Sequence, residues 1–270
     1  LKTNNIPIIL LNGRITKKSF KRWMRFPDFA KKNFSKISLA MPQNTETLKY
    51  LKTLGVKKIK IAGNLKYFSQ SKNILDNNTK TFFKNRLIFC ATSTHYNEEL
   101  FIGKIHNELK LKYKNLLTII IPRHINRSNS ITNELRHIGL KIVTRSSKRK
   151  INKSTDIYIA DTYGEASKFY GLSNITFVGG SLVPHGGQNP LEPARIGNYI
   201  LHGPNIQNFK EVYNMLSKLN ISSKVNNVFN MKKIVNKKIK YKQPLKVSKK
   251  LNLIGSNILK KNLNEINKYL

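Results

Sequence analysis

The chain has 270 residues, 39% of them hydrophobic, which excludes wholesale disorder and favours two domains over one large domain. Its 50 Lys and Arg residues against 13 Asp and Glu residues give a net charge of +37. A field of this sign attracts nucleic acid, an anionic membrane surface or a phosphorylated substrate. The lysines are scattered over the whole chain, however, and an AT-rich genome produces the same bias without selection for binding.

Short apolar runs alternate along the chain with amphipathic segments of helix length. Several of these runs are apolar at successive positions, as in strands covered on both faces, so the pattern predicts an α/β fold with parallel sheets. None of the runs approaches the ~20 apolar residues of a membrane-spanning helix. We predict strands at 6–11, 36–41, 58–62, 86–91, 116–121, 141–144, 156–160, 175–178 and 199–202. The predicted helices include 45–54, 98–112, 131–137 and 209–216.

A polar stretch at 69–80 interrupts this pattern and predicts an interdomain linker. Residues 1–68 contain too few strands for a doubly wound domain, and we interpret them as the remnant of an N-terminal one. Residues 81–243 contain enough for a complete Rossmann-like domain, and 244–270 have apolar residues at helical spacing. The single cysteine, Cys90, lies in an apolar run, so we expect a buried thiol and no internal disulfide.

Four segments stand out because each follows a predicted strand, and ligands bind at the carboxyl ends of strands in open parallel sheets. The segment 63–66, Gly-Asn-Leu-Lys, offers a glycine and a cation to a phosphate or carboxylate, or is a surface turn. The segment 122–124, Pro-Arg-His, offers a guanidinium that binds phosphate through two bonds, or is an exposed strand exit. In 161–165, Thr162 and Glu165 have the spacing of a helix capping box, and the free N–H groups of a helix start also bind anions.

The fourth segment is the most informative, since four of the 14 glycines fall within the nine residues 179–187. Glycine lets the backbone approach a ligand closely and adopt positive φ. We predict that Asn189 is a helix N-cap, with Pro190 at the first helical position and Glu192 at the third. Capping alone explains Asn189 and Glu192, but a carboxylate also accepts bonds from ribose hydroxyls in dinucleotide folds. The combination favours a nucleotide site.

These segments resemble the 3-deoxy-D-manno-octulosonic acid (Kdo) transferases that act on lipid IVA, in the same order and over residues 8 to about 215. The most specific part is 179–192. The other matching motifs are 63–66, 122–124, 161–165, Asn12-Gly13-Arg14 with Ser19, Ser93-Thr94-His95 with Glu98-Glu99, Gly203-Pro204 and Asn208-Phe209.

The resemblance implies a GT-B glycosyltransferase with two Rossmann-like domains, the N-terminal one incomplete here, and a C-terminal helix that returns to the first domain. It implies an inverting transfer of Kdo from CMP-Kdo to the lipid A precursor, lipid IVA, with no cofactor and no catalytic metal. It also implies a place on the cytoplasmic face of the inner membrane, where the protein is peripheral or anchored through an N-terminal segment that precedes this chain.

By position, Lys66 matches a residue that stabilises the transition state. The family's CMP-binding segments are matched by Pro122, Arg123, Tyr163, Gly164, Glu165, Asn189, Pro190, Leu191 and Glu192. Further contacts are expected from Ser93, His124, Gly179, Gly180, Ser181, Gly186 and Gly187.

Two departures from the family pattern stand out. The segment 95–97, His-Tyr-Asn, replaces the family's His-Glu-Gly. The resemblance also places the catalytic base, a glutamate, upstream of Leu1, so we expect this chain alone to bind CMP but to transfer no Kdo.

Two other functions fit the sequence less well. A GT-B enzyme for a UDP-sugar is disfavoured by the Pro-Arg-His and Asn-Pro-Leu-Glu motifs. A basic nucleic-acid-binding protein is disfavoured because no nucleic-acid motif occurs and the aromatic residues are not clustered with the basic ones. We therefore expect no nucleic-acid partner.

Overall fold

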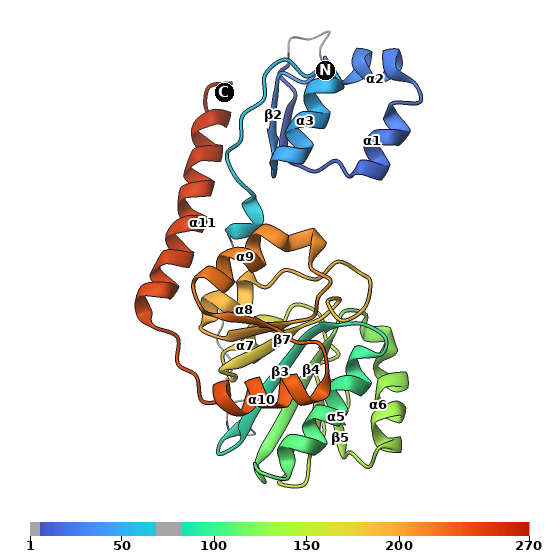
Figure 1. The fold of residues 1–270 in the computed structure, drawn as a ribbon, viewed down its shortest axis with the longest axis vertical. Coiled ribbons are helices and arrows are strands. Elements are labelled where there is room, and N and C mark those ends of the chain that lie inside the picture. The colour runs from blue at the N-terminus through green and yellow to red at the C-terminus, as the bar shows by residue number, and fades with distance from the viewer. Residues whose placement is uncertain (1–5, 69–80, 82, 270) are drawn as a thin grey trace. The chain divides into compact units, whose positions relative to one another are not determined.

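The computed structural model describes residues 6–68, 81 and 83–269 (Figure 1). The chain divides into two compact units, one made of Leu1–Gln70 and Lys249–Leu270 and the other of Ser71–Ser248. The predicted linker at 69–80 lies outside the described residues. Most of the C-terminal helix α11, Leu245–Ile266, therefore belongs to the first unit, together with the beginning of the chain.

The first unit is built around two parallel strands, β1 (Ile9–Gly13) and β2 (Leu39–Pro42). The third strand that the sequence predicts, at 58–62, is present only as a single bridge between Ala40 and Ile59. The segment is extended there, and two backbone hydrogen bonds of 2.9 Å join it to Ala40. The helices of this unit, besides α11, are α1 (Lys17–Trp23), α2 (Pro27–Phe34), α3 (Thr45–Thr53) and the 3-10 turn η2 (Leu65–Tyr67).

Strand β2 is buried on both of its faces, which explains its unbroken apolar sequence. One face packs on a cluster that includes Leu51 and Leu54 of α3 and Ala30 of α2. The other face, with Leu39 and Met41, is covered by the C-terminal end of α11 and the residues after it, including Ile266 and Tyr269. The sequence alternation thus leads to a small sheet with a helix layer on each side.

The second unit contains one parallel sheet of seven strands in the order β5-β6-β4-β3-β7-β8-β9. Its strands are β3 (Leu87–Thr94), β4 (Leu116–Pro122), β5 (Ile142–Thr144), β6 (Ile157–Ile159), β7 (Ile175–Val178), β8 (Tyr199–His202) and β9 (Ser222–Lys224). Its helices are α5 (Glu98–Lys110), α6 (Ser128–His137), α7 (Ala166–Tyr170), α8 (Leu191–Ile196), α9 (Lys210–Lys218) and α10 (Val228–Lys238), with 3-10 turns η3 (Ile125–Arg127) and η4 (Gln207–Phe209).

Helices cover both faces of this sheet. Phe89 of β3 lies in a cluster with the apolar faces of α5, α6 and α10, whereas Cys90 lies in a second cluster with Phe169 and Tyr170 of α7. Successive residues of β3 therefore face opposite layers, as expected for a central parallel strand. The Cys90 thiol is buried, which confirms the predicted burial.

The chain order reverses beside β3. The connections from β3 lead toward β4, β6 and β5 on one side, and β7, β8 and β9 lie on the other side. The carboxyl ends of β3 and β7 thus form a topological switch point, the usual ligand position in open α/β sheets. Of the helices that the structure describes, none is both long enough and apolar enough to cross a membrane.

Candidate nucleotide-binding site

The switch point is lined by the end of β3 with Ser93, by the residues after it with His95, and by the glycine-rich segment 179–187 after β7. The two segments are joined where the strands end, since the Gly179 N–H donates to the Thr92 carbonyl at 2.8 Å. Farther along, the Gly187 N–H donates to the Gly180 carbonyl at 2.7 Å and closes the glycine-rich segment into a loop. We call this segment the glycine loop.

A buried carboxylate fixes the glycine loop. Glu98, at the start of α5, accepts backbone N–H bonds from Gly180 at 2.7 Å, Leu182 at 2.9 Å and Ser181 at 3.0 Å. It also accepts one from His95 at 2.9 Å, and its side chain is fully buried. Hydrogen bonds to an ionised acceptor are about twice as strong as neutral ones, so Glu98 is the main positioning residue of the loop. Sequence reasoning assigned Glu98 no role, although it lies in one of the family motifs.

Two of the candidate residues, Gly179 and Ser181, make contacts within the protein. A Cβ atom at Gly179 would lie 2.5 Å from the Ser93 carbonyl oxygen, so the close approach of the two segments requires glycine there. The Ser181 hydroxyl donates to the Val178 carbonyl at 2.6 Å and accepts from the Gly203 N–H at 2.8 Å. These residues shape the loop from within.

Three imidazole rings gather at the switch point. The ring of His95 lies 4.1 Å from that of His185 and 6.1 Å from that of His124, centroid to centroid. Nδ1 of His95 is 3.0 Å from the Ser93 carbonyl, so in the neutral ring Nδ1 carries the proton and Nε2 accepts. That Nε2 is buried and has no hydrogen-bond partner in the part of the chain that the structure describes. Burial, assisted by the neighbouring His185, lowers the pKa of His95 to about 4, and the ring is neutral at physiological pH.

Pro122 and Arg123 lie at the end of β4, next to β3. Pro122 is buried, and the Arg123 N–H donates to the Thr94 carbonyl at 3.0 Å, which holds this exit against the end of β3. The Arg123 side chain is exposed, and no described carboxylate pairs with it. Its guanidinium is thus presented at the carboxyl edge of the sheet with its donors available.

The segment after β6 differs from the prediction. Helix α7 begins at Ala166, and Glu165 is its N-cap residue without a capping hydrogen bond, so the predicted capping box of Thr162 and Glu165 is wrong. The Glu165 carboxylate instead accepts from the Thr162 hydroxyl at 2.5 Å, from Arg145 at 3.1 Å and from Lys168 at 3.1 Å. The carboxylate therefore binds these two cations and not the backbone N–H groups of a helix start.

These contacts determine the charge of Glu165. Burial raises its pKa, but the hydrogen bonds from Arg145, Thr162 and Lys168 prevail and lower the pKa to about 2. Nearby, the Asp161 carboxylate accepts from the hydroxyl of Ser146 at 2.6 Å. Tyr163 is 79% exposed, and Gly164 has φ +76° in open space, so this turn presents the Tyr163 ring to solvent.

Helix α8 begins one residue later than predicted. Its N-cap is Pro190, and Asn189 accepts the Leu191 N–H at 3.1 Å across a two-residue turn. Asn189 is therefore not the N-cap, and Glu192 is at the second helical position instead of the third. The physical reason is that Pro190 already has helical backbone angles but donates no N–H, which leaves the Asn189 side chain to bond the next residue.

Glu192 is the candidate carboxylate whose acceptors remain open. It is half-buried, and no described residue donates a hydrogen bond to it. Burial raises its pKa, and the positive charge of Arg195, one turn along α8, opposes this rise only in part. The three guanidinium nitrogens of Arg195 are themselves buried without partners. The cost of burying Glu192 is thus offset only in part within the protein, as expected of a residue that binds a ligand.

The candidate residue Lys66 belongs to the first unit, on η2. The Asn64 side chain accepts the Lys66 N–H at 2.9 Å, and the Asn12 side chain accepts the Leu65 N–H at 3.1 Å. The motif at 12–14 and the motif at 63–66 are therefore brought together. Gly63 has φ +95°, and a side chain there would meet Ile258 of α11 at 2.9 Å. All the other candidate residues belong to the second unit.

Comparison with solved structures identifies the class. A glycosyltransferase from Rickettsia africae matches 99% of this chain and 78% of its own, with a TM-score of 0.55 and 14% identity. HepE from Anabaena, solved with UDP, matches 99% of this chain and 73% of its own, with a TM-score of 0.56 and 9% identity. At these identities the likeness concerns the fold alone, and this fold is that of GT-B glycosyltransferases.

Closer relatives identify the family. Residues 1–69 match the family model described as 3-deoxy-D-manno-octulosonic-acid transferase. The 3-deoxy-D-manno-octulosonic acid transferase of Haemophilus influenzae is 36% identical over 218 residues, which cover 78% of this chain and 51% of the relative. That of Rickettsia prowazekii is 32% identical over 228 residues, 82% of this chain and 48% of the relative. The chain thus spans about half the length of these relatives, and it belongs to the Kdo transferase family.

One solved relative is a single domain, and its match covers a part of this chain similar in length to the second unit. The C-terminal CMP-Kdo binding domain of WaaA from Acinetobacter baumannii is 27% identical to this chain, with a TM-score of 0.57. The match covers 67% of this chain and 93% of that domain.

Proposed function

We propose that the second unit binds CMP-Kdo at the switch point and that the protein transfers Kdo to the lipid A precursor, lipid IVA. The observation that carries this proposal is that Arg123 and Glu192, both at the carboxyl edge of the sheet, have no side-chain hydrogen-bond partner among the described residues. The similarity to a solved CMP-Kdo binding domain supports it. A nucleoside monophosphate offers ribose hydroxyls to the carboxylate and an anion to the guanidinium.

In the proposed complex, Glu192 accepts hydrogen bonds from the ribose hydroxyls and Arg123 binds the phosphate. The N–H groups and imidazoles around the glycine loop complete the site, and the exposed ring of Tyr163 contacts the donor. The unpartnered Nε2 of His95 is an acceptor, so it suits a hydroxyl of the bound donor. Glu165 and Glu98 act as positioning residues because their carboxylates are already bound by the protein.

The proposed chemistry is an inverting displacement. The bond from the anomeric carbon of Kdo to the CMP phosphate breaks, and its electron pair stays on the phosphate oxygen. The acceptor hydroxyl oxygen bonds to the anomeric carbon from the opposite face and passes its proton to a general base. Negative charge grows on the leaving phosphate, and we assign its stabilisation to Lys66 and Arg123. The proposed reaction uses no metal ion and no cofactor.

We also propose a peripheral association of the protein with the anionic surface of the inner membrane, on its cytoplasmic face. Helices α1 and α2 support this, because they leave Phe26 69% exposed and Phe29 62% exposed. With Trp23, Arg22 and Ser19 these side chains line a cavity of about 360 Å³. Aromatic rings beside basic residues suit a lipid surface, where the rings enter the headgroup region and the cations meet phosphates.

Calorimetric titration of the 270-residue chain with CMP tests the donor assignment. We expect CMP to bind and UDP to bind at least tenfold more weakly. Arg123→Ala should weaken CMP binding by about 1.5–3 kcal/mol, the usual cost of losing a bond to a charged group. Arg136→Ala is the matched control, since Arg136 is an exposed arginine in the last turn of α6. UDP binding as tightly as CMP, or equal losses in both variants, would refute the assignment.

A further inference from the structure

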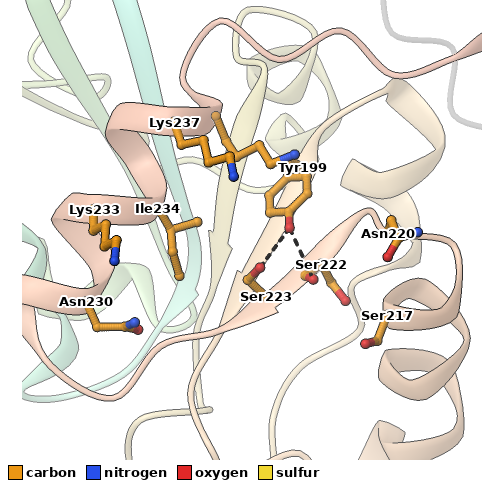
Figure 2. A pocket seen from close by; sticks show the side chains of 10 residues that line it. Tyr199, Ser217, Asn220, Ser222, Ser223, Asn230, Lys233, Ile234 and Lys237 are labelled. Atoms are coloured by element: carbon orange, nitrogen blue, oxygen red, sulfur yellow. Dashed lines mark hydrogen bonds between the residues drawn. The ribbon is translucent and has the colours of Figure 1, made fainter.

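The second unit contains a cavity that the proposed donor site does not use. It has a volume of about 500 Å³, within the usual range for small-molecule sites, and lies among α9, α10 and the strands β8 and β9. Figure 2 shows Lys233 and Asn230 of α10 on one side of it, and Ser217 of α9 and Asn220, which follows α9, on the other. Tyr199 lies between them.

This cavity is at the opposite edge of the sheet from the glycine loop. Tyr199 is the first residue of β8, and Ser222 is the first residue of β9. All seven strands are parallel, so the first residues of these strands lie at the amino edge, whereas the glycine loop follows the carboxyl edge. A ligand in this cavity would therefore bind separately from the nucleotide.

The residues that line the cavity carry several positive charges and no negative charge. Lys233, Lys237 and Lys238 all line it, and the lining contains no Asp or Glu. The Lys238 ammonium lies over the Tyr199 ring, 4.6 Å from its centroid. Lys233 and Lys237 are four positions apart on α10, a spacing at which like charges repel. The neighbouring Lys232, by contrast, pairs with Glu108 at 2.7 Å. A bound anion would relieve the repulsion.

The polar lining points to a ligand that also carries hydroxyl groups. The Ser222 hydroxyl and the side-chain carbonyl oxygen of Asn230 are buried and have no hydrogen-bond partner among the described residues. Tyr199 is held beside Ser222 by its hydroxyl, which donates to the Ser222 carbonyl at 3.3 Å and lies 2.7 Å from the Ser223 hydroxyl (Figure 2). A buried polar atom costs free energy unless it forms a hydrogen bond. The side-chain carbonyl oxygen of Asn230 can only accept a hydrogen bond, so its partner on the ligand must be a donor such as a hydroxyl group.

We propose that this cavity is a binding site for a phosphorylated sugar or polyol. The phosphate lies between the ammonium groups of Lys233 and Lys237, and a hydroxyl of the ligand donates to Asn230. The volume accommodates a molecule of the size of a hexose phosphate. The same chemistry occurs in a soluble sugar phosphate and in a phosphorylated lipid headgroup, and the test distinguishes the two.

The test is a titration of the whole 270-residue chain with glucose 6-phosphate, inorganic phosphate and glucose at low salt. We expect glucose 6-phosphate to bind more tightly than phosphate and glucose not to bind. The double variant Lys233→Gln/Lys237→Gln should lose at least tenfold in affinity for glucose 6-phosphate. The control Lys232→Gln/Lys240→Gln removes the same charge from the same region outside the lining, and should change the affinity less than twofold.

Asn230→Ala distinguishes the contribution of the sugar hydroxyls from that of the phosphate. It should weaken the binding of glucose 6-phosphate but not of inorganic phosphate. CMP affinity, unchanged in every variant, reports that the fold is intact. Displacement of glucose 6-phosphate by phosphatidate vesicles would assign the site to a lipid headgroup, and no displacement would assign it to a soluble ligand. Absence of glucose 6-phosphate binding, or equal losses in the two double variants, would overturn the proposal.

Discussion

The segments after β6 and β7 each contain a glutamate near the start of a helix, but the two carboxylates differ in their hydrogen bonds to the rest of the protein. Glu165 is bound by Arg145, Lys168 and Thr162, and its pKa is lowered to about 2. Glu192 has no such donors among the described residues, and burial raises its pKa. A motif match therefore does not separate positioning residues from ligand-binding ones. The count of hydrogen bonds already made within the protein does separate them.

Glu98 is the extreme case of an engaged carboxylate, and Glu98→Gln should give the largest effect. The amide keeps the volume, but each carboxylate oxygen accepts two of the four backbone N–H bonds, so the NH2 group places donors against two of these N–H groups. We expect unfolding to become easier by about 3 kcal/mol or more, with loss of CMP binding, since each unsatisfied buried group costs ~1–3 kcal/mol. Thermal and denaturant unfolding measure this. Glu134→Gln on α6 is the control, and a similar small change in both variants would contradict the role given to Glu98.

Lys66 extends the comparison from binding to chemistry. If it stabilises charge that develops in the transition state, Lys66→Ala in a full-length enzyme should lower the turnover of Kdo transfer by about 100-fold or more. The affinity for CMP should hardly change, because Lys66 belongs to the first unit and the candidate CMP residues to the second. Turnover and binding are measured by mass spectrometry of the product and by calorimetry. Equal losses in the two quantities would make Lys66 an ordinary binding residue.

A substitution of Glu192 tests whether the carboxylate without protein donors binds the ligand. Glu192→Ala should weaken CMP binding by about 1–3 kcal/mol, the cost of losing hydrogen bonds to a charged group. The fold should not suffer, because no described residue depends on this carboxylate for a hydrogen bond. Calorimetry and thermal unfolding of the same sample provide both readings. An unchanged CMP affinity would leave Glu192 as a residue of the helix start only.

The pH dependence of the same residue gives the smallest effect. The folded-state pKa of Glu192 is raised, so the neutral form favours folding and this contribution is lost as pH rises through the folded pKa. Glu192→Gln should therefore raise the stability of the free protein at pH 7. For Glu165 the folded pKa is lowered, so its contribution is lost only as pH falls from about 4.5 toward 2. Unfolding curves at pH 7 and pH 4 for each Gln variant check both signs.

The sheet of the second unit was predictable because its central strands are long apolar runs, and six of its strands lie where the sequence predicts them. The edge strand β9 was missed, since its sequence Ser-Ser-Lys contains no apolar residue and it pairs on one side only. Helices α1 and α2 were missed for a related reason. α1 buries no side chain and α2 buries only Ala30, so neither shows the apolar stripe of a core-facing helix.

Within the site, the order of the motifs along the sequence predicted which segments lie at the carboxyl edge, because parallel strands bring their ends together. Hydrogen-bond partners could not be predicted in this way. The bond from the Thr162 hydroxyl to Glu165 keeps the predicted pair but not its capping role, since Arg145 reaches the same carboxylate from another strand end. Glu98 lies 82 positions before Gly180, and no local pattern reveals that contact.

The most direct test of the central claim is a crystal structure of the chain with bound CMP. We predict that the nucleotide lies at the switch point between the ends of β3 and β7. Its ribose hydroxyls should lie within 2.6–3.2 Å or so of the Glu192 carboxylate, and its phosphate within the same reach of the Arg123 guanidinium. A CMP molecule bound elsewhere, such as in the lysine-lined cavity at the amino edge, or at the switch point without either contact, would contradict the account.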